Sequence, residues 1–153
     1  MKLASEDVIA MSDEQKLVVL EALVVGVLAD GKVEPEEVKR FDEVVGTLPW
    51  GLDKAVLAAL VTQTQQRVSS LPNAQAVTDF VINMAARIPT ATLRDKVFFT
   101  MCTIMAADGD VNRLEKAVIG VFVLAFGITS DRLAAIKTAI IGRVVAAEAV
   151  EVN

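Results

Sequence analysis

The chain has 153 residues, of which 54% are apolar, with a net charge of −5 and a length that fits one domain with a full core. It has no histidine and only one cysteine, Cys102, which excludes Ser-His-Asp and Cys-His triads, histidine or cysteine-rich metal sites and intrachain disulfides. The acidic balance, with no basic block, argues against nucleic acid as a partner.

The high apolar fraction raises the question of a membrane segment. The longest uninterrupted apolar run, residues 117–128, is far shorter than the roughly 20 residues that a spanning helix needs. Residues 1–7 lack the apolar stretch of a secretion signal. We therefore expect a cytoplasmic protein with no direct membrane span, and a helix buried in a globular core at residues 117–128.

Nearly every long segment shows helical periodicity or is apolar throughout, and no stretch alternates with period two. The first long helix should start at Ser12, because Ser12 and Gln15 have the spacing of a capping box. It should run to about Ala29. Only Glu21 interrupts its apolar surface beyond Leu17, so the helix should be largely buried.

The second helix is predicted from its start, where Pro35 fits the first position, Glu34 the cap and Glu37 the third position. The remaining elements follow from caps and breakers. Their expected positions are an end of the second helix near 46–49, helices at 51–68 and 73–87, one from 90 or 92 to 107, one from a cap at 112 to 127, one from 129–131 to about 147, a short turn near 5–10 and a frayed tail at 148–153.

An acidic turn occurs twice in the chain. The pattern Ala-Asp-Gly-x-Val-x-x-x-Glu stands at residues 29–37 and again at 107–115, and segments 17–55 and 95–133 align over this offset without a gap. The repeat predicts an all-α fold: one domain over residues 1–153, a compact bundle of about seven helices with two helix–turn–helix repeats related by a pseudo-twofold axis.

Two interpretations of the acidic turns stay open. In the first, the turns are structural: Gly ends one helix and the glutamate caps the next. In the second, they bind a divalent cation, because an aspartate at a helix C-terminus faces the negative end of the dipole and needs an offsetting charge. Carboxylates suit hard cations such as Ca²⁺, Mg²⁺ or Mn²⁺, although the spacing is not that of an EF-hand. The candidate metal ligands are Asp30, Glu34, Glu37, Asp108, Asp110 and Glu115.

Three other features carry expectations. Cys102 lies in an apolar run and should be a buried structural thiol. Trp50, in a turn, should be either a lid over the core or a partner contact. The basic residues are dispersed and should be solvated; they are Lys39, Arg40, Lys54, Arg67, Arg87, Arg94, Lys96, Arg132, Lys137 and Arg143.

The double motif, in a compact acidic helical chain, resembles the TerB-like family, which comprises bacterial tellurite-resistance protein TerB and related helical domains. The resemblance covers about residues 12–147 and rests on the two Ala-Asp-Gly turns with their following glutamates. It implies an all-helical fold with pseudo-twofold halves and a divalent cation at the acidic turns. It also implies a binding or scaffold module with protein partners, in a stress-response complex peripheral to the inner membrane.

Three functions are compatible with these observations. The first is a non-enzymatic binding module of the tellurite-resistance or stress-response type. The second is a carboxylate-metal hydrolase that uses the acidic turns to hold an activated water, against which stands the lack of histidine for acid–base work. The third is a purely structural helical adaptor without metal. The sequence does not determine the oligomeric state.

Overall fold

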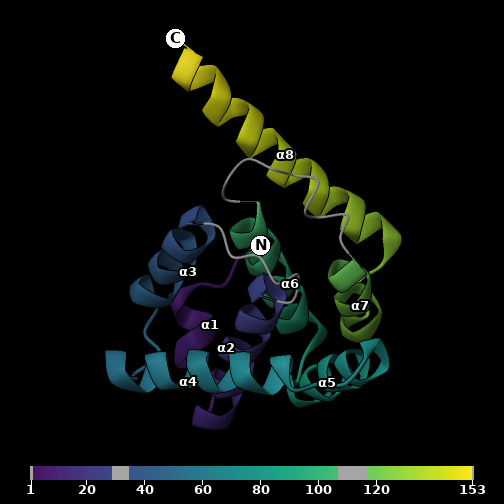
Figure 1. Cartoon of the computed structure of the whole chain (residues 1–153). Coiled ribbons are helices and arrows are strands. Elements are labelled where there is room, and N and C mark those ends of the chain that lie inside the picture. The colour runs from purple at the N-terminus through teal and green to yellow at the C-terminus, as the bar shows by residue number, and fades with distance from the viewer. Residues whose placement is uncertain (1, 29–34, 107–116, 153) are drawn as a thin grey trace.

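A computed structural model describes residues 2–28, 35–106 and 117–152, without the side chains of 28, 36, 37 and 143–152 (Figure 1). All regular elements in these ranges are α-helices, so the all-α prediction is confirmed. The helices are α1 (Ser5–Ile9), α2 (Asp13–Leu28), α3 (Pro35–Thr47), α4 (Lys54–Ser69), α5 (Ala74–Arg87), α6 (Ala91–Met105), α7 (Ala117–Phe126) and α8 (Ser130–Val152).

Local capping accounts for most helix starts. The predicted capping box at α2 is present: the Ser12 backbone N–H donates to Gln15 Oε1 over 2.9 Å, and the Gln15 N–H donates to Ser12 Oγ over 3.2 Å. Pro35 is the first residue of α3, as predicted. Asn73 and Thr90 cap α5 and α6 through their side chains.

Two boundaries differ from the prediction. Helix α4 begins at Lys54 rather than near residue 51, because the Asp53 carboxylate accepts the Val56 N–H over 2.9 Å and so caps the helix there. Helix α8 continues to Val152, so the frayed tail predicted at 148–153 was wrong for residues 148–152. No glycine or proline occurs after Gly142 to stop the helix.

Helix α2 lies at the centre of the bundle, where it packs against α6, α4 and α5 (Figure 1). It is apolar on all sides, which is typical of a helix surrounded by others. Its residues 18–25 are buried, as is the facing run 97–102 of α6, and the two helices share one core with Phe122 of α7 and Ile136 of α8. The prediction of a largely buried first helix is confirmed.

The helix bounds follow the 78-residue repeat. Shifted by this offset, α2 corresponds to α6 and α4 to α8, and the corresponding helices α2 and α6 pack against each other. The start of the helix that corresponds to α3, including the predicted cap Asn112, lies outside the described residues. The single domain and the pseudo-twofold axis remain predictions.

The one charged side chain within the buried part of α2 is held by two arginines. Glu21 is 5% exposed, and its carboxylate accepts hydrogen bonds from Arg67 Nη1 at 2.6 Å and Arg87 Nη2 at 3.1 Å. The Arg67 guanidinium also lies over the Phe80 ring, 5.0 Å from its centroid. This ion cluster, defined as Glu21, Arg67 and Arg87, joins α2 to α4 and α5.

Of the basic residues expected to be solvated, Arg67 and Arg87 are, with side chains 58% and 38% exposed, although both pair with Glu21. Lys96 and Arg132 are less exposed, at 29% each, and are also paired. Besides the two arginines of the ion cluster, Lys96 Nζ pairs with Asp7 over 2.8 Å and so connects α1 to α6. Arg132 forms a two-pronged pair with Asp95, 2.5 and 2.6 Å between nitrogen and oxygen, which connects α8 to α6. These carboxylates lie far from their partners in sequence, so only the packing of the helices brings them together.

We expect Gly26→Ala to destabilise the protein by about 1–3 kcal/mol through overpacking. A Cβ at Gly26 would overlap the Sδ and Cγ atoms of Met101, which is fully buried on α6. Urea unfolding measures the effect. Gly120→Ala is the control: its Cβ would enter open space within α7, so it should stabilise by about 0.5–1 kcal/mol. Equal stability of the two variants would contradict the close α2–α6 contact.

We expect removal of the two arginines of the ion cluster to destabilise the protein more than neutralisation of its glutamate. The double change Arg67→Ala and Arg87→Ala leaves the Glu21 carboxylate buried without a partner and should cost about 3–5 kcal/mol. Glu21→Gln keeps a hydrogen-bond acceptor and leaves arginines that reach water, since their side chains are 58% and 38% exposed; it should cost about 1–2 kcal/mol. Thermal and urea unfolding at neutral pH would show the order, and the reverse order would refute this account.

Candidate functional site

The predicted metal ligands lie on or beside the two acidic turns. Asp30, Glu34, Asp108, Asp110 and Glu115 lie outside the described residues. Glu37 lies in α3, at the third helical position as predicted, and its side chain is not described. Within the described ranges, no group of three or more His, Cys, Asp or Glu residues is placed to hold a metal ion. The metal site remains a prediction.

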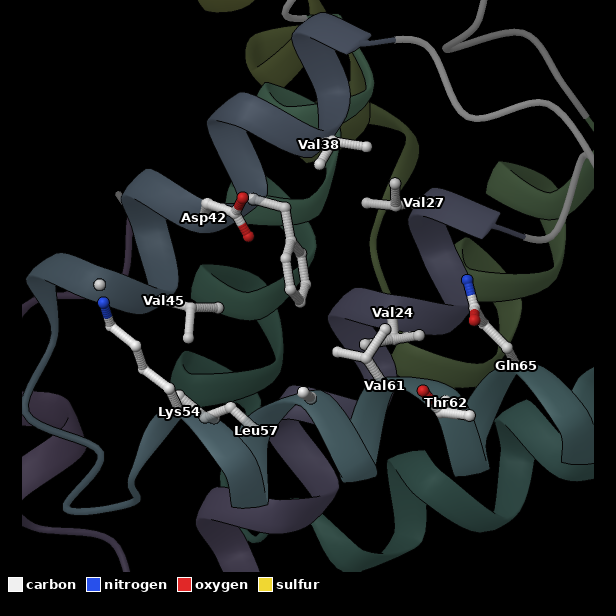
Figure 2. A pocket seen from close by; sticks show the side chains of 13 residues that line it. Val24, Val27, Val38, Asp42, Val45, Lys54, Leu57, Val61, Thr62 and Gln65 are labelled. Carbon is white, nitrogen blue, oxygen red and sulfur yellow. The ribbon is translucent and has the colours of Figure 1, made fainter.

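A groove with a volume of about 920 Å³ lies between α2, α3 and α4 in the described part of the chain. Figure 2 shows valines of α3 (Val38, Val45) and α4 (Val61) on opposite walls, with Val24 and Val27 of α2 behind them. The full lining is Val24, Val27, Val38, Phe41, Asp42, Val45, Gly46, Lys54, Leu57, Ala58, Val61, Thr62 and Gln65. We call it the α2–α3–α4 groove.

The groove exists because its two walls pack on different helices. Helix α4 packs against α2, whereas α3 packs mainly against α6. The apolar stripes on α3 and α4 consequently face each other without meeting, and Val38 is left 46% exposed. The volume of the groove and its mainly apolar lining suit an apolar ligand or an apolar helix face.

Two charged side chains lie among the apolar lining residues. Asp42 lies on the α3 wall between Val38 and Val45, and Lys54 is at the first position of α4; Figure 2 shows both on the left side of the view. Within the described residues, neither forms an ion pair or a hydrogen bond through its side chain. The two opposite charges nearly cancel, while the two groups offer an occupant one hydrogen-bond donor and one acceptor.

Sequence reasoning missed this groove. The apolar residues of α3 recur at Val38, Phe41 and Val45, which is the spacing of a core-facing stripe. Periodicity cannot distinguish a stripe that packs on a neighbouring helix from one that lines a groove. The composition of α3 was a signal that could have pointed to the groove. Helix α3 has far fewer apolar residues than α2, so it can pack against the core on one side only.

A second hollow, of about 360 Å³, lies at the start of α6 beside α8. Its charged residues are engaged with one another or with α1: Arg132 binds Asp95, and Lys96 binds Asp7. These pairs connect helices, so the α2–α3–α4 groove is the stronger candidate for binding.

Trp50 and Cys102 both belong to the core. Trp50 is 2% exposed, which confirms the lid interpretation and excludes the alternative of a partner contact. Its indole Nε1 is buried without a hydrogen-bond partner among the described residues. Cys102 is 1% exposed, and burial raises the pKa of its thiol to about 12, with the charge of Lys137 acting in the opposite direction. The interpretation of a structural thiol is confirmed by this burial.

The described residues thus form an all-α protein with a half-open apolar groove between three helices. The family model for tellurite resistance protein TerB matches residues 14–138, from α2 into α8, and includes both acidic turns and the whole groove. The chain belongs to the TerB family. Searches of curated proteins and of solved structures found no match. Among the described residues, no helix combines the length and apolar character needed to cross a bilayer.

We expect the Cys102 thiol to resist iodoacetamide at mildly alkaline pH in the folded protein, because it is buried and its pKa of about 12 keeps it protonated. Modification should proceed once urea unfolds the chain. An engineered cysteine at the exposed position Thr138 on α8 is the reactive control. Alkylation of Cys102 in the folded state at the rate of this control would show that the core around α6 opens.

Proposed function

We propose that the chain is a non-enzymatic, cytoplasmic binding module of the tellurite-resistance or stress-response type, and that its α2–α3–α4 groove recognises protein partners. The family match supports the biological setting. The groove carries the binding role, because it places a mainly apolar surface between three helices and adds two charged side chains, Asp42 and Lys54, that have no partner among the described residues. An apolar helix face is the ligand that such a surface fits best.

The apolar lining favours a binding module over the carboxylate-metal hydrolase. A hydrolase needs polar groups that orient a substrate next to its activated water. Of the groove residues, Asp42, Lys54, Thr62 and Gln65 are polar, and the remaining nine are apolar or glycine. This composition supports recognition by burial of apolar surface, with the polar residues setting orientation.

We also propose that the acidic turns bind a divalent cation, with Asp30, Glu34 and Glu37 in the first turn and Asp108, Asp110 and Glu115 in the second. Oxygen ligands of this kind select hard cations, here Ca²⁺, Mg²⁺ or Mn²⁺. The first turn joins α2 to α3, and both of these helices line the groove, Val27 shortly before the turn and Val38 shortly after it. A cation there would stabilise the spacing of two groove walls. Through its partners the module would act at the periphery of the inner membrane.

The groove is tested by Ala58→Arg, which introduces a long charged side chain at an exposed lining position of α4. In cells whose growth on tellurite depends on this chain, we expect the variant to lose protection. Ala59→Arg adds the same charge at the next exposed residue, outside the groove lining, and should protect as well as the unmodified chain. Circular dichroism confirms that both variants are folded. Full protection by Ala58→Arg would refute partner binding in the groove.

The cation is tested by thermal unfolding. If it binds only the folded state, the melting temperature should rise with millimolar Ca²⁺, Mg²⁺ or Mn²⁺. Asp30→Asn should reduce this rise more than Asp108→Asn, because Glu34 and Glu36 enrich the first turn and Arg113 opposes a cation in the second. Glu148→Gln, remote in sequence from both turns, is the control and should leave the rise intact. A melting temperature that none of the three cations changes would leave protein binding without a cation.

A further inference from the structure

The distal end of α8 projects from the bundle. The first half of the helix is anchored, since Ile136 and Ile140 are buried and the helix packs mainly against α6. Beyond Ile140 the exposure changes: Ile141 is 42% exposed, and the helix then extends past the bundle to its end (Figure 1). We call residues 141–152 the α8 end.

The α8 end is rich in small apolar residues. Of its twelve residues, three are charged (Arg143, Glu148 and Glu151) and eight are Val, Ile or Ala. Its apolar residues gain most when they pack against another surface. An apolar helix that leaves the bundle in this way is typical of a segment that docks on another surface.

The α8 end does not reach the groove of its own molecule. Helix α8 is uninterrupted from Ser130 to Val152, and the burial of Ile136 and Ile140 fixes its direction. In Figure 1 its end points away from α4, which forms one wall of the groove. A helix without a break cannot turn back, so an occupant of this kind must come from a second molecule.

The groove and the α8 end match in their chemistry. The groove offers an apolar lining with a carboxylate, Asp42, and an ammonium group, Lys54, neither of which has a partner in the described part of the chain. The α8 end is an apolar helix that carries one cationic side chain and two carboxylates. Each sign in the groove therefore has an opposite sign on the helix.

We propose that the α8 end of one copy docks in the α2–α3–α4 groove of a second copy. A reciprocal exchange gives a closed dimer with two such contacts, as in isologous association. An external partner would then compete with the α8 end for the same surface. This inference deepens the proposed function by naming an occupant of the groove, and it rests on that proposal in treating the groove as a helix-binding surface.

The test is the association of the purified full-length chain, followed by sedimentation velocity from micromolar to near-millimolar concentration. We expect concentration-dependent association of the unmodified chain. Ala58→Arg should abolish it by blocking the groove, and Val145→Lys with Val150→Lys should abolish it by charging the α8 end. The matched controls are Ala59→Arg, and Ala135→Lys with Thr138→Lys at exposed positions on the anchored half of α8; both should associate as the unmodified chain does.

A mixture of the two disrupted variants provides the sharper result. The groove-blocked copy retains an intact α8 end, and the copy with the charged end retains an intact groove, so one of the two contacts can form between them. The equimolar mixture should therefore associate where neither variant does alone. A monomeric unmodified chain, association that both disrupted variants retain, or a mixture that stays monomeric would each overturn the inference.

The outcomes also separate this inference from the proposed function. If the unmodified chain is monomeric and Ala58→Arg still abolishes protection against tellurite, self-association is overturned and the partner-binding groove is kept. If Ala58→Arg abolishes association but leaves protection against tellurite unchanged, the partner-binding function is overturned and self-association is kept.

Discussion

The arrangement of the bundle depends on how a carboxylate is accommodated in its central helix. Glu21 stands in a part of α2 that is otherwise buried and apolar, and a buried charge is costly unless it is paired and hydrogen-bonded. Arg67 and Arg87 meet this requirement from α4 and α5, with guanidinium groups that still reach water. The ion cluster therefore ties α4 and α5 to α2 at Glu21, while the desolvation of the arginines stays small.

Because α4 packs against α2, a groove is left between α4 and α3. Helix α4 is held to α2 by apolar contacts and by Arg67, whereas α3 is held mainly by α6. Two helices that pack against different neighbours diverge, and the space between them is the α2–α3–α4 groove.

Trp50 is buried just before the N-terminus of α4. The next residue, Gly51, adopts a φ of 72° that suits glycine. The Trp50 N–H has no partner among the described residues, which costs about 1–3 kcal/mol and opposes the gain from burying the indole.

The groove and the acidic turns are linked through the chain itself. The first turn connects α2 with α3, so whatever sets its conformation also sets the relation between the floor and one wall of the groove. The α8 end, which carries apolar residues beyond the bundle, supplies a surface of the kind that the groove accepts. Cation binding, partner binding and self-association would thus act on one part of the molecule, and each can be perturbed separately by substitutions at different residues.

The sequence by itself determined the helices, most of the described helix starts and the buried character of α2. Caps such as Ser12 with Gln15, Pro35, Asn73 and Thr90 act within one turn, so their effect can be read from neighbouring residues. The repeated Asp-Gly turns likewise indicated the family, because the motif lies in a short stretch.

Only the tertiary structure decided how the helices meet. The partners of Glu21 are 46 and 66 residues away, and that of Arg132 is 37 residues away, so no local pattern could show that these charges are paired. The groove was hidden for the same reason: the apolar stripe of α3 has the periodicity of a core helix, and whether it meets another helix or faces a gap depends on the packing of α4 and α6. Periodicity specifies which face of a helix is apolar, and long-range packing specifies what that face contacts.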